Sequence, residues 1–275
     1  MECLVRGIPI RYEEYGTGRP LLMLHGWPGF HGFMTHHLEP LFAQRPGWRR
    51  LYPNLPGMGG TPGADWITGQ DQMLEATLGF LDAVAPGERF ALAGASYGGY
   101  LGRGVIRARQ AQLDGAFLWT PLVETDPARK DLPAHQVFAR DPDLLATLPP
   151  DEIPWTRVSV AQTPAMLAEF RAAVKPGFQA ADREFLGRIA QRYAFSFDVD
   201  ALPEPCPAPV LLLAGRQDAQ CGYREAWKLL DNFPRATFAV LDRAGHGVAS
   251  EQRPLFRALV GEWLDRVEEY IAQRA

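Results

Sequence analysis

The stretch Gly94-Ala95-Ser96-Tyr97-Gly98 has the residue types that an exposed serine nucleophile requires. The apolar run Phe90 to Ala93 precedes it and a helical pattern follows it to Gln110, so the serine lies on a sharp strand-to-helix turn. The residues two before and two after such a serine must be small because larger side chains would collide, and both are glycines here. The turn lifts the Ser96 hydroxyl out of the sheet and directs the first amides of the helix at an adjacent anion.

A serine hydroxyl is a weak nucleophile at neutral pH, so it needs a base within hydrogen-bond reach and a group that orients that base. The chain has six histidines. His246 is the best candidate because it lies between two glycines in the loop that follows the last predicted strand. The glycines allow the backbone to bend toward the edge of the sheet.

Asp218 is the best candidate for the orienting acid. It directly follows the apolar run Val210 to Ala214, which is a predicted strand, so it lies at the same edge of the sheet as the serine and the histidine. Glu124 and Asp126 are rival acids because they follow the predicted strand 115–119, which ends at that edge too.

The elements that must position these residues alternate between strand and helix up to residue 122. Residues 4–15 alternate apolar and polar side chains and predict a β-hairpin, whereas the later apolar runs are unbroken, as in strands covered on both faces. Further strands are predicted at 21–24, 51–53, 90–93, 115–119, 210–214 and 237–241, and core helices at 35–44, 67–84, 98–110, 224–232 and 254–273. This order predicts an α/β fold with a mostly parallel, doubly wound central sheet.

Residues 123–205 have a different composition. The segment is rich in Pro, Asp and Arg, has no strand-like apolar run, and shows helical patterns at 164–174 and 180–193. We therefore predict a helical cap (lid) at 123–205, inserted after the sixth strand, with the α/β core formed by 1–122 and 206–275. Such a cap usually holds the substrate against the core.

Composition excludes several classes of partner. A chain of 275 residues suffices for one large α/β domain with an insertion. The net charge of -4 argues against a nucleic-acid surface, and no run of about 18 apolar residues predicts a membrane span. The three cysteines lack metal-ligand spacing, so neither a metal site nor a disulfide framework is predicted. Because the N-terminus lacks a secretory pattern, we expect a cytoplasmic protein. We expect its partner to be a small-molecule substrate, and the sequence indicates no particular oligomeric state.

The chain resembles the α/β-hydrolase superfamily, in which a serine, an acid and a histidine follow one another in this order. The resemblance depends on the turn at Ser96, the loop His25 to Gly29, the segment Gly215 to Asp218 and the segment Gly245 to Gly247. It implies a catalytic triad of Ser96, Asp218 and His246. It also implies an oxyanion hole formed by the backbone N–H groups of Trp27 and Tyr97, a turn-stabilising role for His25, and no cofactor.

The loop His25 to Gly29 also resembles that of epoxide hydrolases and haloalkane dehalogenases. Those enzymes need a carboxylate nucleophile, because their alkyl-ester intermediate is cleaved by water at its carbonyl. Ser96 would form an ether instead, so both chemistries are excluded. A serine leads to acyl transfer through an acyl-enzyme. The prediction is therefore a serine hydrolase for a small, largely apolar carboxylic ester.

Several other functions remain open. An aminopeptidase similar to proline iminopeptidases would use Asp151, Glu152 or Glu169 to bind the substrate amine. A carbon-carbon bond hydrolase for vinylogous diketones would need arginines to hold a substrate carboxylate. Perhydrolase and haloperoxidase activities are further alternatives, because their enzymes have a similar serine turn. A non-catalytic binding protein is a further alternative, against which the complete triad argues. Cys221, near the acid segment, is interpreted as a buried thiol, with no histidine positioned to activate it in preference to Ser96.

Overall fold

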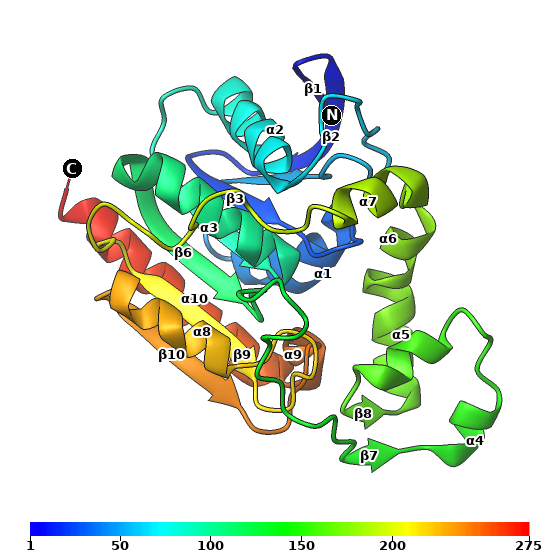
Figure 1. Cartoon of the computed structure of the whole chain (residues 1–275). Helices are drawn as coiled ribbons and strands as arrows, with labels where there is room; N and C mark the ends of the chain where they lie inside the picture. Colours follow the sequence, from blue (N-terminus) through cyan, green and yellow to red (C-terminus); the bar gives the residue numbers. More distant parts are fainter. Residues whose placement is uncertain (275) are drawn as a thin grey trace.

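The computed structural model of the chain describes residues 1–274 and contains an eight-stranded, mostly parallel sheet with helices on both faces (Figure 1). Its spatial order is β1-β2-β4-β3-β5-β6-β9-β10. The hairpin β1-β2 and the pair β2-β4 are antiparallel, and every other neighbouring pair is parallel. The predicted α/β class is confirmed. The strands are β1 (Glu2–Val5), β2 (Ile8–Tyr15), β3 (Arg19–Leu24), β4 (Trp48–Pro53), β5 (Phe90–Ala95), β6 (Leu113–Trp119), β9 (Val210–Gly215) and β10 (Ala236–Leu241).

Two hydrophobic cores lie on opposite faces of the sheet. The helices α2 (Gln70–Val84) and α3 (Tyr97–Arg109) pack on one face, and α1 (His31–Phe42) and α10 (Arg253–Ala272) pack on the other. Alternate residues of β9 enter alternate cores, which is why the strand is apolar throughout. The predicted helix at 224–232 is divided into α8 (Arg224–Trp227) and a 3₁₀ turn (Lys228–Asn232).

The segment between β6 and β9 adds no strand to the main sheet. It contains α4 (Pro142–Ala146), α5 (Pro164–Ala173), α6 (Lys175–Gln179) and α7 (Arg183–Ala190), and it projects from one side of the sheet (Figure 1). Two-residue strands, β7 (Ala139–Arg140) and β8 (Ala161–Gln162), pair with each other there. The sequence did not predict them, because so short a pairing leaves no apolar run.

One buried arginine holds both ends of this inserted segment. Arg103 of α3, with an exposed fraction of 3%, donates to the carbonyl oxygen of Leu122 at 2.7 Å, where the chain leaves the core. It also donates to both carboxylate oxygens of Asp200, at 2.8 and 3.1 Å, shortly before the chain returns through β9. A buried guanidinium needs such a carboxylate, so the exit and return of the chain are fixed together.

No helix within residues 1–274 is long and apolar enough to span a membrane.

Candidate active site

Ser96 lies on the strained turn between β5 and α3. Its φ of 52° is in the left-handed region that non-glycine residues rarely adopt. A Cβ atom at Gly94 would lie 2.4 Å from the carbonyl oxygen of Gly98, and one at Gly98 would lie 2.0 Å from that of Leu24. Backbone atoms cannot move aside as flexible side chains do. Both positions therefore require glycine, as the sequence predicts.

Asp218 and His246 are in direct contact. The Nδ1 atom of His246 lies 2.9 Å from Oδ2 of Asp218, which is fully buried, whereas the histidine side chain is 20% exposed. The other carboxylate oxygen accepts the N–H groups of Gln220 and Cys221. Burial alone would lower the pKa of His246, but Asp218 and the adjacent Cys221 raise it well above its usual value.

The two rival acids lie in a turn of their own. Glu124 accepts the N–H of Asp126 and the guanidinium of Arg129, which lower the pKa of Glu124. Neither Glu124 nor Asp126 bonds to His246 within residues 1–274. Asp218 is thus the carboxylate that this structure places on the candidate base.

Ser96 and His246 line one cavity, but they form no hydrogen bond to each other within the described residues. Instead, the Oγ atom of Ser96 lies 4.0 Å from Sγ of Cys221. Catalytic hydrogen bonds are often long in unliganded enzymes and tighten when substrate binds, so this geometry is compatible with a triad. The pairing of Ser96 with His246 stays a prediction.

Cys221 is buried, as inferred from sequence, and it also lies close to the candidate catalytic residues. Single donor atoms of Asp218, Cys221 and His246 lie within 4.8 Å of one another, and the histidine ring lies beside the thiol. His246 thus lies near both Cys221 and Ser96, and the inference that it does not activate Cys221 in preference to Ser96 stays a prediction. The sequence feature that indicates this position of Cys221 is its three-residue spacing from Asp218, because a short turn at the carboxylate brings the thiol back toward the histidine.

The two predicted oxyanion donors have no competing acceptor. Within residues 1–274, neither the Trp27 nor the Tyr97 backbone N–H donates a hydrogen bond. A Cβ atom added at Gly26 would lie 3.4 Å from Cβ of Ser96, so the peptide that carries the Trp27 N–H runs beside the serine. The position of both amides is compatible with an oxyanion hole.

His25 holds the first of these peptides, and sequence analysis assigned it a turn-stabilising role. Leu55 donates its N–H to Nε2 of His25 at 3.1 Å, so Nδ1 carries the proton and donates to the Gly26 carbonyl at 2.8 Å. Complete burial lowers the pKa of His25 to about 4, which keeps the ring neutral in this arrangement. Because the Gly26 carbonyl belongs to the Gly26-Trp27 peptide, the histidine fixes the direction of the Trp27 N–H.

The cavity beside Ser96 has a volume of about 250 Å³ and lies between the core and the inserted segment. Its lining is largely apolar and includes no Lys or Arg among the described residues. Three ionisable side chains other than His246 reach it, namely His37, Glu169 and Glu251. The larger apolar side chains are Trp27, Phe33 and Trp119 from the core and Trp155, Met166, Phe170, Val174 and Phe178 from the inserted segment.

Glu251, in α9 (Val248–Glu251), is a residue of the site that sequence reasoning missed. One carboxylate oxygen accepts the N–H of Val160 from the inserted segment at 2.9 Å, and the other accepts that of Gly245, next to His246, at 2.8 Å. Burial raises the pKa of Glu251. This side chain connects the inserted segment to the loop that carries the candidate base.

Comparisons with known proteins agree with this architecture. A model of the "Alpha/beta hydrolase family" matches residues 21–258. A 2-hydroxymuconate semialdehyde hydrolase from Pseudomonas sp. (strain CF600) is 26% identical over 277 residues, which cover 96% of this chain and 93% of that protein. A pimeloyl-[acyl-carrier protein] methyl ester esterase from Legionella pneumophila (strain Paris) is 21% identical and covers 93% of this chain and 99% of its own length. The crystal structure of an alpha/beta superfamily hydrolase from Oenococcus oeni PSU-1 is 25% identical, with a TM-score of 0.87 over 98% of this chain and 99% of that one.

Proposed function

The chain belongs to the α/β hydrolase family, and we propose that it is a serine hydrolase that cleaves small, uncharged carboxylic esters. The observation that carries the proposal is the cavity: Ser96 on its strained turn and His246, held by the buried Asp218, face one small, largely apolar space without a Lys or Arg in its described lining.

In the proposed reaction, Oγ of Ser96 attacks the ester carbonyl carbon while His246 takes the hydroxyl proton. The oxyanion that forms accepts the N–H groups of Trp27 and Tyr97. His246, now positive and stabilised by Asp218, gives the proton to the departing alkoxide oxygen. Water then attacks the acyl-enzyme by the same route, with His246 acting first as base and then as acid.

We further propose that residues 123–205 are the cap that determines substrate size. Helices α5 and α6 supply a wall of the cavity through Met166, Phe170 and Phe178. The volume of about 250 Å³ lies below the range of about 300 to 1,000 Å³ that is typical of ligand sites. The substrate is therefore a small ester with short acyl and alcohol groups.

The charge of the lining favours an uncharged substrate. A carboxylate in this cavity would be desolvated with no Lys or Arg in the described lining to pair with it, which costs several kcal/mol. Arg253 is close to the cavity wall, but it is bonded to Glu169. A carbon-carbon bond hydrolase that holds a substrate carboxylate with arginines is thus disfavoured.

The acidic residues considered for an aminopeptidase already have partners. Arg171 and Lys175 bind Glu152 and lower its pKa to about 2, and Lys175 also binds Asp151. Glu169 does line the cavity, but His36 and Arg253 bind its carboxylate. No carboxylate of this set is free for a substrate amine, which favours esters over aminopeptidase substrates.

The test compares Ser96→Ala with Ser250→Ala, a matched control whose serine lines the same cavity. We expect the first variant to lose at least about 10³-fold in kcat on p-nitrophenyl acetate and the second to stay within about twofold. Across p-nitrophenyl esters, kcat/KM should fall from acetate to long acyl chains. Undiminished turnover by the Ser96 variant, or no covalent adduct of Ser96 with a fluorophosphonate, would refute the proposal, and the second result would favour a binding protein.

A further inference from the structure

Cys221 lies against the candidate catalytic residues, although the proposed ester hydrolysis gives it no part. Its Sγ atom is 4.0 Å from Oγ of Ser96, and donor atoms of Asp218 and His246 complete a group spanning no more than 4.8 Å. The thiol side chain is buried, and 4.0 Å is a long distance for a hydrogen bond to sulfur. The sulfur therefore lies beside the imidazole and has no strong bond to Ser96.

One carboxylate holds both the backbone of Cys221 and the imidazole of His246. Oδ1 of Asp218 accepts the N–H of Cys221 at 3.1 Å, and Oδ2 contacts Nδ1 of His246 at 2.9 Å. Gly222 follows with a φ of +71°, which completes the turn behind the cysteine. The backbone of Cys221 and the ring of His246 are consequently held from the same buried group.

This arrangement has the features of a site for a thiophilic cation. Zinc binds thiolate sulfur at about 2.3 Å and imidazole nitrogen at about 2.0–2.1 Å, so tetrahedral ligands of these types lie about 3.5 Å apart. The ligand atoms of the group, which lie within 4.8 Å of one another, would have to approach by about 1 Å or less. Histidines that bind metals usually donate their other ring N–H to a carboxylate, and Asp218 already occupies Nδ1 of His246. Nε2 is left as the ligand atom.

We propose that Cys221 and His246 form a binding site for a divalent cation of the zinc class, in which Oγ of Ser96 and water complete the coordination. When the cation binds, the thiol loses its proton to solvent, and so does Nε2 of His246 where the ring is protonated. A cation on Nε2 occupies the lone pair that would accept the serine proton, so the occupied protein is inactive as a hydrolase. Only this inhibition rests on the proposed function; the binding itself does not.

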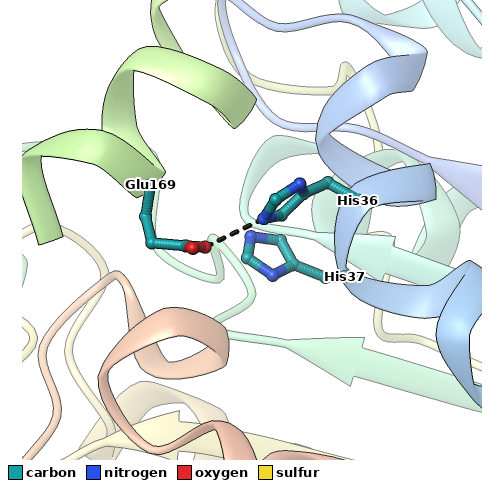
Figure 2. A group of neighbouring side chains, drawn as sticks. All are labelled: His36, His37 and Glu169. Carbon is teal, nitrogen blue, oxygen red and sulfur yellow. Dashed lines mark hydrogen bonds and ion pairs between the residues drawn. The ribbon is translucent and has the colours of Figure 1, made fainter. Parts of the chain in front are cut away.

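A second group of metal-ligating side chains is the rival site. Figure 2 shows the rings of His36 and His37 from α1 converging with the carboxylate of Glu169 from α5. Oε2 of Glu169 is already bound by Nε2 of His36 at 2.8 Å and by the guanidinium of Arg253 at 2.5 Å. A cation there would displace a guanidinium and then lie beside its positive charge, with no thiolate as compensation.

Cadmium and zinc titrations of the full chain separate the two sites. Cadmium bound to a thiolate gives a sulfur-to-metal charge-transfer band in the ultraviolet, which reports binding without any enzyme assay. The test variants are Cys221→Ala and Cys221→Ser. The controls are Cys3→Ala, which removes a thiol of β1, and His36→Ala, which removes a ligand of the rival site.

We expect one cadmium per chain with the thiolate band in the wild type, in Cys3→Ala and in His36→Ala, and no band in either Cys221 variant. The zinc concentration that halves each protein's own esterase rate should rise at least about 100-fold in the Cys221 variants only, and a chelator should restore activity. A band that persists without Cys221, the absence of a band in the wild type, or zinc sensitivity that is lost with His36 instead would overturn the inference. If the wild type has no esterase activity, the cadmium band still decides the site.

Discussion

Replacing His37 with phenylalanine is expected to stabilise the protein in acid while leaving its stability near pH 8 almost unchanged. His37 is 5% exposed and packs against the rings of Phe33, Trp119 and Phe256, with centroid separations of 5.0, 5.5 and 6.3 Å. Its ring nitrogens form no hydrogen bond within residues 1–274. The substitution therefore exchanges one planar ring for another among aromatic neighbours without breaking a bond.

The magnitude follows from the pKa of His37. Burial, and then the charges of His36, Arg253 and Arg257, lower this pKa to about 3, against a smaller opposing effect of Glu169. An unfolded histidine has a pKa of about 6.5, so between these values the unfolded chain binds the proton and the folded protein does not. Above about pH 6.5 the neutral His37 therefore costs the folded protein nothing. As the pH decreases below that value, His37 lowers the free energy of unfolding, by about 2 kcal/mol at pH 5. The phenylalanine variant lacks this loss.

The measurement is urea denaturation of both proteins at intervals from pH 8 to pH 5. His25, whose pKa is also lowered by burial, is present in both proteins, so its contribution cancels in the difference. We expect the variant to gain about 2 kcal/mol over the wild type between the two ends of the range. A difference that stays constant across the range, or an advantage for the wild type that grows in acid, would refute the reasoning.

Three further changes test the geometry of the site. Asp218→Asn removes the charge that raises the pKa of His246, so the rise of kcat/KM with pH should move to lower pH while kcat falls on the order of 10⁴-fold; an unchanged pH profile would argue against this partner. Gly98→Ala places a Cβ atom 2.0 Å from a carbonyl oxygen and should lower stability by about 3 kcal/mol or more in thermal unfolding, whereas Gly187→Ala, which meets nothing within 4 Å, should be neutral or stabilising. Glu251→Gln leaves one backbone N–H facing an amide N–H, so kcat on p-nitrophenyl acetate should fall about tenfold and the free energy of unfolding by about 1–3 kcal/mol. A variant with the kcat of the wild type would show that Glu251 does not position the loop that carries His246.

The main sheet was predictable because its strands are covered on both faces, and burial on both faces leaves an unbroken apolar run such as Val210 to Ala214. The same reasoning fails in the inserted segment. The five-residue helices α4 and α6 and the two-residue strands β7 and β8 are too short to show a hydrophobic period. Their conformation depends on tertiary contacts, which local sequence does not encode.

At the site, residues that follow predicted strands could be placed together, because parallel strands end at one edge of the sheet. Asp218 and His246 meet for that reason. Cys221 could not be placed, since its contact with Ser96 joins positions far apart in the chain and depends on the turn at Asp218. Glu251 was missed because its carboxylate accepts two backbone N–H groups, and backbone donors leave no sequence motif.

The hydrogen bonds that Arg103 donates to both ends of the inserted segment also affect how this protein can change during evolution. It holds Leu122 and Asp200 together, so the roughly 80 residues between them form a loop whose two ends are fixed close to each other. The entropic cost of such a loop grows only logarithmically, by about 0.6 kcal/mol for each doubling of its length. Insertions and deletions in the exposed loops of the segment therefore cost little stability as long as Arg103 keeps these two contacts. The cavity wall formed by α5 and α6 can therefore diversify, whereas α7 cannot change as freely, because its Phe185, Leu186 and Ile189 belong to the core that also contains residues of the sheet.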